Sequence, residues 1–355
     1  MGQKIKVEGN EKRKIHFDMI RIFAIILVIF NHTNEKGFFL FSITENEVTR
    51  QIYTAMSILC TIAVPLFFMV SGALLLNKEE SITKLFKKRI LRIVMVIFIF
   101  SIFQEIYFVC VQKYEFSMLE FLRIIFQDRI IIPYWYLYAY LAFLIMLPFL
   151  RKLVKSLEEK EYQYLFAIYF VLQGIVPIFC YFLKLERVNL FIPLLEQTIF
   201  YPILGYYLEY KEKEYERKDV LKLIGASIIV VIILTGMTWI RASNVGELSE
   251  FGNGLFLTGL TAIPAVTFYC GLKYFSMHHL INKTILQILQ WISRDVFTIY
   301  LIEERVREMT EGIDELLIPV IGWMPSCFVW IFCIMIICIA IAEILRRIPG
   351  IKKLL

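Results

Sequence analysis

Three ionisable residues with the potential for acid–base chemistry occur in the first apolar stretch of the chain: Asp18, Arg21 and His32. On a helix that turns about 100° per residue, Arg21 and His32 are about 20° out of phase, and Asp18 lies on the same side three positions before Arg21. Imidazole can exchange a proton near neutral pH, and ionisable groups at membrane depth usually mark function. The residues alone also allow a plainer reading, an Asp18–Arg21 ion pair at a helix end with an interfacial His32.

A basic group opens a later apolar stretch. Lys88 and Arg89 are followed by Arg92 in an R-x-x-R arrangement. The planar guanidinium group binds phosphate through two parallel hydrogen bonds, so these residues are candidates for holding a phosphorylated ligand. The alternative is that they are only the positive charges that mark the cytoplasmic end of a membrane helix.

Other polar side chains interrupt apolar stretches further along the chain. We expect Glu105 and Glu196 to face the interior of a bundle rather than lipid, and Glu303 to lie near the outer end of a helix. Trp135 belongs to a cluster of aromatic residues that is either an interfacial belt or a stacking platform for a sugar. We take Trp135, Glu105 and Glu303 as candidate substrate-binding residues.

The elements that must position these side chains are long apolar helices. Of 355 residues, 59% are hydrophobic and 20% charged, and the mean hydropathy is +0.66. The apolar residues concentrate in runs of roughly 20, the length that spans a bilayer. The sequence therefore predicts an all-α, multi-pass bundle of about ten transmembrane helices near 15–33, 52–76, 93–111, 130–150, 164–183, 188–208, 223–240, 254–272, 285–302 and 316–342.

The distribution of positive charge predicts the orientation of this bundle. With the N-terminus inside, 26 of the 38 Lys and Arg residues fall in inside segments and 10 in outside loops. We therefore expect both termini in the cytoplasm, with tails at 1–14 and 346–355 flanking a membrane domain at 15–345. The net charge of +6 then indicates loops that face anionic membrane lipid, not nucleic acid.

Two other interpretations of the sequence are disfavoured. The segment Thr33–Lys36 has no small-residue cleavage site, so we expect the first helix to be retained rather than removed as a signal peptide. The seven cysteines include no C-x-x-C pair and lie almost entirely in apolar runs. We expect no metal and no disulfide from them.

Several motifs together resemble membrane-bound acyltransferase family 3. The run from Phe17 to His32 is similar to the first helix of that family, with D-x-x-R and a following His. Pro65–Leu74, Arg89–Arg92, Trp135–Leu137 and Phe297–Leu301 resemble further family motifs in the same order. Many relatives carry a second His where this chain has Glu303, so the resemblance does not carry a second-histidine role over to this position.

The resemblance implies an acyl-coenzyme A donor, such as acetyl-CoA, on the cytoplasmic side and a saccharide or glycan hydroxyl as acceptor at the cell membrane. Arg89, Arg92 and Lys88 would then hold the phosphates of the donor. His32 would act as general base or carry the acyl group, and Arg21 with Asp18 would order the donor or stabilise negative charge. A transporter or flippase of lipid-linked saccharides is the alternative, which would account for buried charge but not for the R-x-x-R motif.

Overall fold

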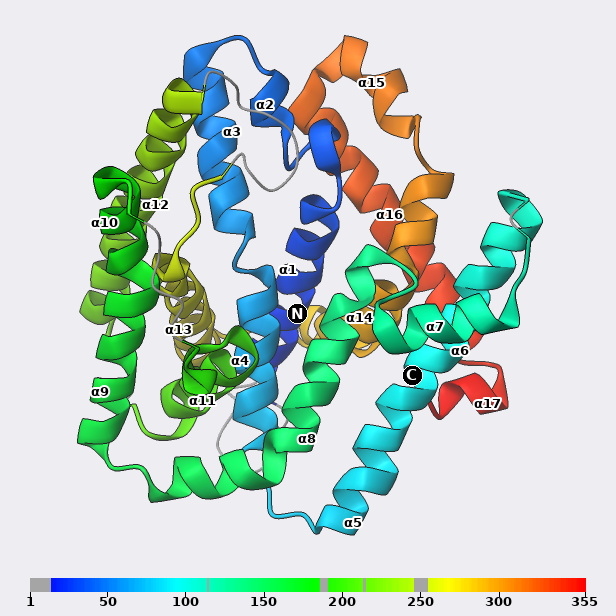
Figure 1. Cartoon of the computed structure of the whole chain (residues 1–355), viewed down its shortest axis with the longest axis horizontal. Helices are drawn as coiled ribbons and strands as arrows, with labels where there is room; N and C mark the ends of the chain where they lie inside the picture. Colours follow the sequence, from blue (N-terminus) through cyan, green and yellow to red (C-terminus); the bar gives the residue numbers. More distant parts are fainter. Residues whose placement is uncertain (1–13, 114, 186–190, 213–214, 246–254) are drawn as a thin grey trace.

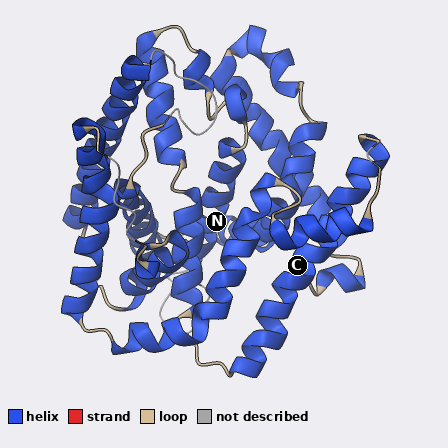
Figure 2. Ribbon diagram, viewed as in Figure 1, coloured by secondary structure: helices blue, strands red, loops and turns tan. Residues whose placement is uncertain are grey.

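A computed structural model describes residues 14–113, 115–185, 191–212, 215–245 and 255–355. Within these ranges every regular element is a helix, and no strand is present (Figure 2). This confirms the all-α class. The predicted N-terminal tail lies outside the described residues except for Lys14, and so do the first positions of the runs predicted at 188–208 and 254–272.

The helices follow one another with short connections. In chain order the described ranges contain α1 (Ile15–Asn31), η1 (Asn34–Lys36), α2 (Leu40–Ile43), α3 (Glu47–Cys60), α4 (Ala63–Leu75), α5 (Ile82–Leu85), η2 (Phe86–Ile90), α6 (Leu91–Val111), α7 (Met118–Gln127), η3 (Ile132–Tyr134), α8 (Trp135–Ser156), α9 (Glu159–Tyr169), η4 (Phe170–Ile175), α10 (Val176–Leu183), η5 (Pro193–Leu195), α11 (Gln197–Tyr210), α12 (Arg217–Val245), η6 (Gly259–Thr261), α13 (Ala262–His278), α14 (Lys283–Met309), α15 (Ile313–Ile321), α16 (Trp323–Leu345) and α17 (Pro349–Lys352).

Seven helices in the described part of the chain are long and apolar enough to cross a membrane: Glu47–Leu75, Ile82–Val111, Ile132–Ser156, Glu159–Leu183, Arg217–Asn244, Lys283–Met309 and Trp323–Leu345. The other three predicted runs contain α1, α11 and α13, which have 17, 14 and 17 residues. They are near or below the shortest usual length for a spanning helix. The count of ten and the sides of the termini therefore stay predictions.

Two of the predicted runs are broken helices, and the local residue types are compatible with both breaks. In the run 52–76 the helix stops at Cys60 and restarts at Ala63, so that Pro65 falls in a first turn, where its missing N–H leaves no hydrogen bond unmade. In the run 316–342 the chain turns at Gly322, whose φ of +82° favours glycine.

Outward-facing apolar side chains fit a lipid environment. On α12, Leu221, Ile224, Ile228 and Ile232 follow helical spacing, and all are exposed. A continuous apolar stripe on the outside of a protein is expected where its surroundings are hydrocarbon rather than water.

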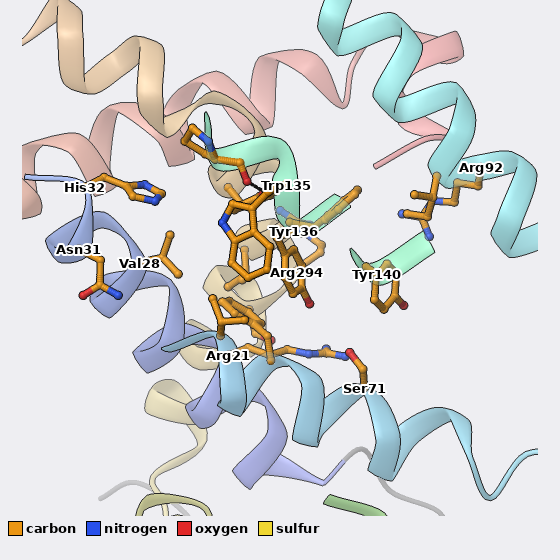
Figure 3. Close-up of a pocket in the computed structure, with 18 residues that line it drawn as sticks. Arg21, Val28, Asn31, His32, Ser71, Arg92, Trp135, Tyr136, Tyr140 and Arg294 are labelled. Atoms are coloured by element: carbon orange, nitrogen blue, oxygen red, sulfur yellow. Dashed lines mark hydrogen bonds between the residues drawn. The ribbon is translucent and has the colours of Figure 1, made fainter. Parts of the chain in front are cut away.

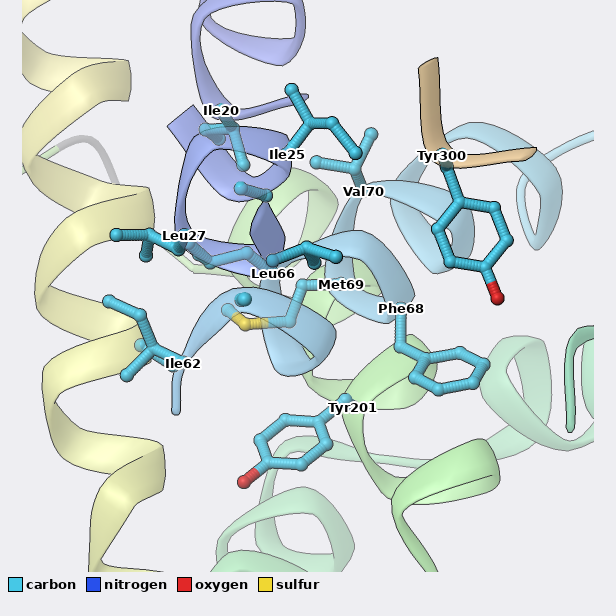
Figure 4. Packing of buried hydrophobic residues seen from close by; sticks show 14 of the residues in the cluster. Ile20, Ile25, Leu27, Ile62, Leu66, Phe68, Met69, Val70, Tyr201 and Tyr300 are labelled. Carbon is cyan, nitrogen blue, oxygen red and sulfur yellow. The ribbon is translucent and has the colours of Figure 1, made fainter. Parts of the chain in front are cut away.

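The interior centres on α1 and on the crossing of α4 with α11. Helix α1 packs against α4, α13 and α14 and lies in the middle of the molecule in Figure 1. At the crossing, a Cβ added to Gly72 would come within 2.0 Å of the Pro202 carbonyl oxygen, and one added to Gly205 within 2.0 Å of the Met69 oxygen. Only glycine permits this approach of the two backbones, which buries Leu66 and Met69 completely (Figure 4).

One expectation about buried charge is wrong. Glu196 does not face the bundle interior but is exposed, because η5 ends at Leu195 and α11 begins only at Gln197. The acidic side chain thus sits at the N-terminal end of α11, where the helix dipole favours negative charge.

Candidate functional site

A cavity of about 610 Å³ lies among α1, α4, α6, α8 and α14 (Figure 3). This volume is within the range of roughly 300–1,000 Å³ that is typical of small-molecule sites. Its walls carry both aromatic and cationic side chains. The lining residues are Arg21, Val28, Asn31, His32, Val64, Phe67, Ser71, Arg92, Ile93, Pro133, Trp135, Tyr136, Tyr140, Ser293, Arg294, Val296, Phe297 and Tyr300.

Helix α1 supplies the cationic and basic residues of one wall. Arg21, Val28 and His32 all line the cavity, as their helical spacing predicts. Figure 3 shows Arg21 extended toward Ser71 of α4, with His32 at the other end of the helix. Asp18 does not line the cavity. It is buried behind the wall, where its Oδ1 accepts a hydrogen bond of 2.7 Å from the Ser293 hydroxyl.

His32 is held by a carboxylate from the opposite end of the chain. Its Nδ1 lies 2.7 Å from Oε1 of Glu303 on α14, and Glu303 is completely buried. Because a carboxylate can only accept, Nδ1 must carry the hydrogen, which leaves Nε2 as the basic nitrogen of the neutral ring. The second oxygen of Glu303 has no hydrogen-bond partner among the described residues. This arrangement fixes the ring and stabilises a positive charge on it.

The chain directly after His32 is fastened to α15. Lys36 Nζ lies 3.1 Å from Glu315 Oε1 and 3.3 Å from Asp314 Oδ2. Burial alone would lower the pKa of Lys36, but the hydrogen bonds to Glu315 and Asp314 outweigh burial and raise the pKa above its usual value. The end of α1 is therefore tethered as well as packed, which limits the movement of His32.

A metal could in principle reach the same place. His32, Glu303 and Glu304 bring ligand atoms within 4.8 Å of one another. All three side chains already have a partner within the protein, since Glu303 accepts a hydrogen bond from His32 and Glu304 pairs with Arg307 at 2.8 Å. Each of the three groups thus has one protein partner, while the second oxygen of Glu303 has none among the described residues, and the expectation of no metal stays a prediction.

The R-x-x-R pair is divided between two cavities. Arg92 lines the main cavity, whereas Arg89 and Lys88 line a second one of about 470 Å³ together with Lys78, Lys84 and two glutamates. The cause is the π-helical turn η2, in which each residue advances the helix by a smaller angle than in an α-helix. Residues three apart therefore diverge more than α-helical spacing predicts.

The two arginines also differ in their charge partners. Arg89 Nε donates to Oε2 of Glu80 at 2.9 Å, and Arg151 Nη2 donates to the same oxygen at 3.2 Å. Arg92 pairs with no Asp or Glu in the part of the chain that the structure describes. Its cation lies 5.8 Å from the centre of the Phe297 ring. Arg92 is thus a cation on the cavity wall that lacks a side-chain counterion.

With this geometry in place, comparison with known proteins identifies the family. The model of an acyltransferase domain, acyltransferase family 3, matches residues 15–344. The chain belongs to acyltransferase family 3. No curated protein and no solved structure matches it significantly.

Membership confirms the resemblance that the motifs indicated and makes the main cavity the candidate active site of an acyltransferase. Trp135, as predicted, lines this cavity and remains exposed over 39% of its surface. Tyr136 stacks on Tyr140 with 6.0 Å between ring centres and meets Tyr300 edge-on at 5.6 Å. The aromatic cluster therefore forms a wall of the site, whatever part it also has in an interfacial belt.

The other two candidate substrate-binding residues of this acyltransferase lie elsewhere. Glu303 does not line the cavity but contacts His32 from behind. Glu105 is half-buried on α6 and lines neither of the two cavities. Substrate binding by Glu105 stays a prediction without support from the geometry.

Sequence reasoning missed Arg294, Ser71 and most of the α14 wall. The signal was nevertheless present, because the lining residues of α14 recur at helical spacing on one face: Ser293, Arg294, Val296, Phe297 and Tyr300. The family motif Phe297–Leu301 lies within this face, so extending it backward by one turn would have found Arg294.

Proposed function

We propose that this acyltransferase moves a short acyl group, such as acetyl, from acyl-coenzyme A to a hydroxyl of a saccharide or glycan at the cell membrane. The observation that carries the proposal is the Glu303-supported His32 in a cavity that extends to Arg92. A base at one end and a cation without a side-chain counterion at the other suit a long donor with a reactive thioester and an anionic nucleotide.

In the proposed reaction, Nε2 of His32 takes the proton of the acceptor hydroxyl as the hydroxyl oxygen bonds to the thioester carbonyl carbon. The carbon–sulfur bond then breaks, and sulfur leaves with the proton that the imidazolium returns. The products are the ester and the coenzyme A thiol. Glu303 stabilises the imidazolium, as a buried carboxylate does beside a catalytic histidine. A transient acyl-His32 intermediate uses the same groups and remains the second route.

The position of Arg21 favours one of its two predicted roles. At 1.5 Å of rise per residue, Arg21 and His32 are roughly 16 Å apart along α1. This is too far for Arg21 to stabilise an oxyanion beside His32, but it suits contact with the donor between its nucleotide and its thioester. Asp18 then acts indirectly, since it is buried behind the wall and bonded to Ser293.

Family membership favours this enzymatic function over a transporter or flippase. The test compares wild-type protein with His32→Gln, using His278→Gln as the matched control because His278 is exposed and outside the cavity. Each purified variant is given acetyl-CoA in proteoliposomes, and release of free coenzyme A thiol is followed together with O-acetyl content of surface glycans in expressing cells. Full activity of His32→Gln would exclude the mechanism, and flux of saccharide without thiol release would favour the transporter.

A further inference from the structure

Residues 349–355, which we call the tail, fold back onto the candidate donor site. After α16 ends at Leu345, a turn leads to the short helix α17, which lies beside α6 in Figure 1. Arg92 of α6 donates from Nε to the main-chain oxygen of Leu354 at 2.8 Å and from Nη2 to that of Leu355 at 2.7 Å. The guanidinium edge formed by Nε and Nη2, which could bind a phosphate through two parallel hydrogen bonds, is thus directed at the tail.

The tail is held there by packing as well as by hydrogen bonds. Leu354 and Leu355 are half-buried against the hydrophobic core, whereas Lys352 and Lys353 are exposed. The main-chain N–H groups of both leucines bond back to the Ile351 oxygen at 2.8 and 3.1 Å. This compact turn presents the main-chain oxygens of Leu354 and Leu355 side by side as the two acceptors for Arg92.

The segment before the tail is anchored separately. Arg346 donates to the main-chain oxygen of Arg294 at 2.7 Å and also pairs with Asp295, both on α14. Pro349 then begins α17. Residues 349–355 are thus a short arm on a fixed base, and they could leave Arg92 without disturbing α16.

We propose that residues 349–355 form an intrasteric plug, which occupies Arg92 in place of the donor's phosphate groups and must leave before acyl-coenzyme A binds. This rests on the proposed function, in which Arg92 holds the donor. The main-chain oxygens of Leu354 and Leu355 imitate two phosphate oxygens in geometry, but together they carry less negative charge than a phosphate monoester, so a true phosphate competes well for a guanidinium. The plug therefore lowers donor affinity without abolishing it.

The size of the effect follows from the fraction of molecules in which the tail is seated. If the binding-competent state is one tenth of the population, the apparent Kd of the donor is about tenfold weaker than the intrinsic Kd. Removing the plug removes this factor. Binding of coenzyme A to full-length protein should likewise release the tail, because the two linked equilibria are reciprocal.

The experiment measures coenzyme A binding by calorimetry in nanodiscs for the full chain and for a chain that ends at Ile348. We expect about tenfold tighter binding to the shortened protein, and a synthetic peptide of residues 348–355 should weaken it again, while a scrambled peptide should not. Arg92→Gln is introduced into both proteins. If the shortened chain fails to fold, full-length protein with Leu354→Ser and Leu355→Ser replaces it, because these changes remove the packing that seats the tail.

The outcomes separate the two proposals. Equal coenzyme A affinity with and without the tail, while Arg92→Gln weakens binding in both proteins, would overturn the plug and leave the donor site intact. No effect of Arg92→Gln in the shortened protein would remove Arg92 from the donor site and overturn the plug as well. If shortening the chain tightens coenzyme A binding when Arg92 is present but not in the Arg92→Gln protein, the donor site and the plug are both supported.

Discussion

Glu303 and His32 are 271 positions apart in the chain, yet the Glu303 Oε1 atom within α14 and the His32 Nδ1 atom at the end of α1 lie 2.7 Å from each other. Glu303 is completely buried, and the His32 side chain remains 24% exposed toward the cavity. The pair thus joins a protected carboxylate to a ring that can reach a substrate. From the family resemblance we expect histidine at this place in many relatives; here it is a carboxylate, which in the proposed mechanism supports His32 as the base.

Replacing Glu303 with Gln should lower acyl transfer strongly. Gln keeps the size of the side chain and can still accept a hydrogen bond from Nδ1, but it cannot balance the charge of an imidazolium. A loss of about 10²-fold or more in kcat is expected, since general-base catalysis contributes typically 10²–10⁴-fold. Thiol release from acetyl-CoA is the measurement.

Glu304→Gln is the matched control for this change. Glu304 is the next residue of α14 and pairs with Arg307 at 2.8 Å, so its loss should leave the orientation of His32 nearly unchanged. If Glu303→Gln and Glu304→Gln lower kcat equally, the carboxylate acts on the stability of this region rather than on His32.

Sequence alone predicted the part of the site that one helix carries. Arg21 and His32 face the same cavity because helical spacing fixes their relative directions. The contact between His32 and Glu303 could not be predicted in this way, because it depends on how α1 and α14 pack. For the same reason Glu303 was assigned to the substrate and not to His32.

The crossing of α4 and α11 should be sensitive to a single methyl group. Gly72→Ala or Gly205→Ala would place a Cβ within 2.0 Å of backbone oxygen, so the two helices must separate. We expect a destabilisation of about 1–3 kcal/mol or more, as for other overpacked interiors. Thermal unfolding in detergent is the measurement.

Gly236→Ala serves as the comparison, because a Cβ at Gly236 of α12 meets nothing within 4 Å. In a helix this exchange should be neutral or stabilising by up to about 1 kcal/mol. Equal effects at Gly72 and Gly236 would mean that the close approach of α4 and α11 does not contribute to stability.

The helices themselves were largely predictable, since each of the ten apolar runs contains helix in the described residues. The breaks within these helices could not be predicted. A long apolar run has the same composition whether it is straight or interrupted, so the interruption after Cys60 and the turn at Gly322 depend on tertiary packing. The exposure of Glu196 follows from another helix boundary that the sequence did not predict, the start of α11 at Gln197.

Orientation in the membrane can be tested with single cysteines in a cysteine-free background. We expect a cysteine at Glu45 to react with an impermeant maleimide from outside and one at Glu158 only after permeabilisation, because the distribution of positive charge places these loops on opposite sides. Both positions are exposed. Labelling of both from the same side would contradict the ten-helix topology.

Glu80 should make stability depend on pH. Its burial alone would raise the pKa of the carboxyl, but hydrogen bonds from Arg89 and Arg151 outweigh burial and hold the pKa below its usual value. Because the pKa of Glu80 is lower in the folded protein, the contribution of its carboxylate to stability is complete above the unfolded pKa of about 4.3. This contribution is lost as pH falls through the folded pKa. The difference in Tm between wild type and Glu80→Gln should therefore be constant above about pH 5 and shrink below it. A difference that stays constant on acidification would show that this ion cluster is not coupled to folding.

The division of the R-x-x-R pair predicts unequal effects of two matching substitutions on donor binding. In the protein that ends at Ile348, Arg92→Gln should weaken binding of coenzyme A about 10- to 150-fold, which corresponds to the roughly 1.5–3 kcal/mol of a charge-assisted hydrogen bond. Arg89→Gln should have a smaller effect on binding, because Arg89 is neutralised by Glu80 and faces the second cavity.

Dephospho-coenzyme A, which lacks the 3′-phosphate, assigns the remaining contacts. If Lys88 and Arg89 hold that phosphate in the second cavity, Arg89→Gln should weaken coenzyme A binding and leave dephospho-coenzyme A binding unchanged, whereas Arg92→Gln should weaken both. If the Arg89→Gln protein binds both ligands with wild-type affinities, Arg89 has only a structural role, in the ion cluster with Glu80 and Arg151. Donor recognition would then depend on Arg92 and the other cations of the main cavity, because Arg21 and Arg294 line the same walls.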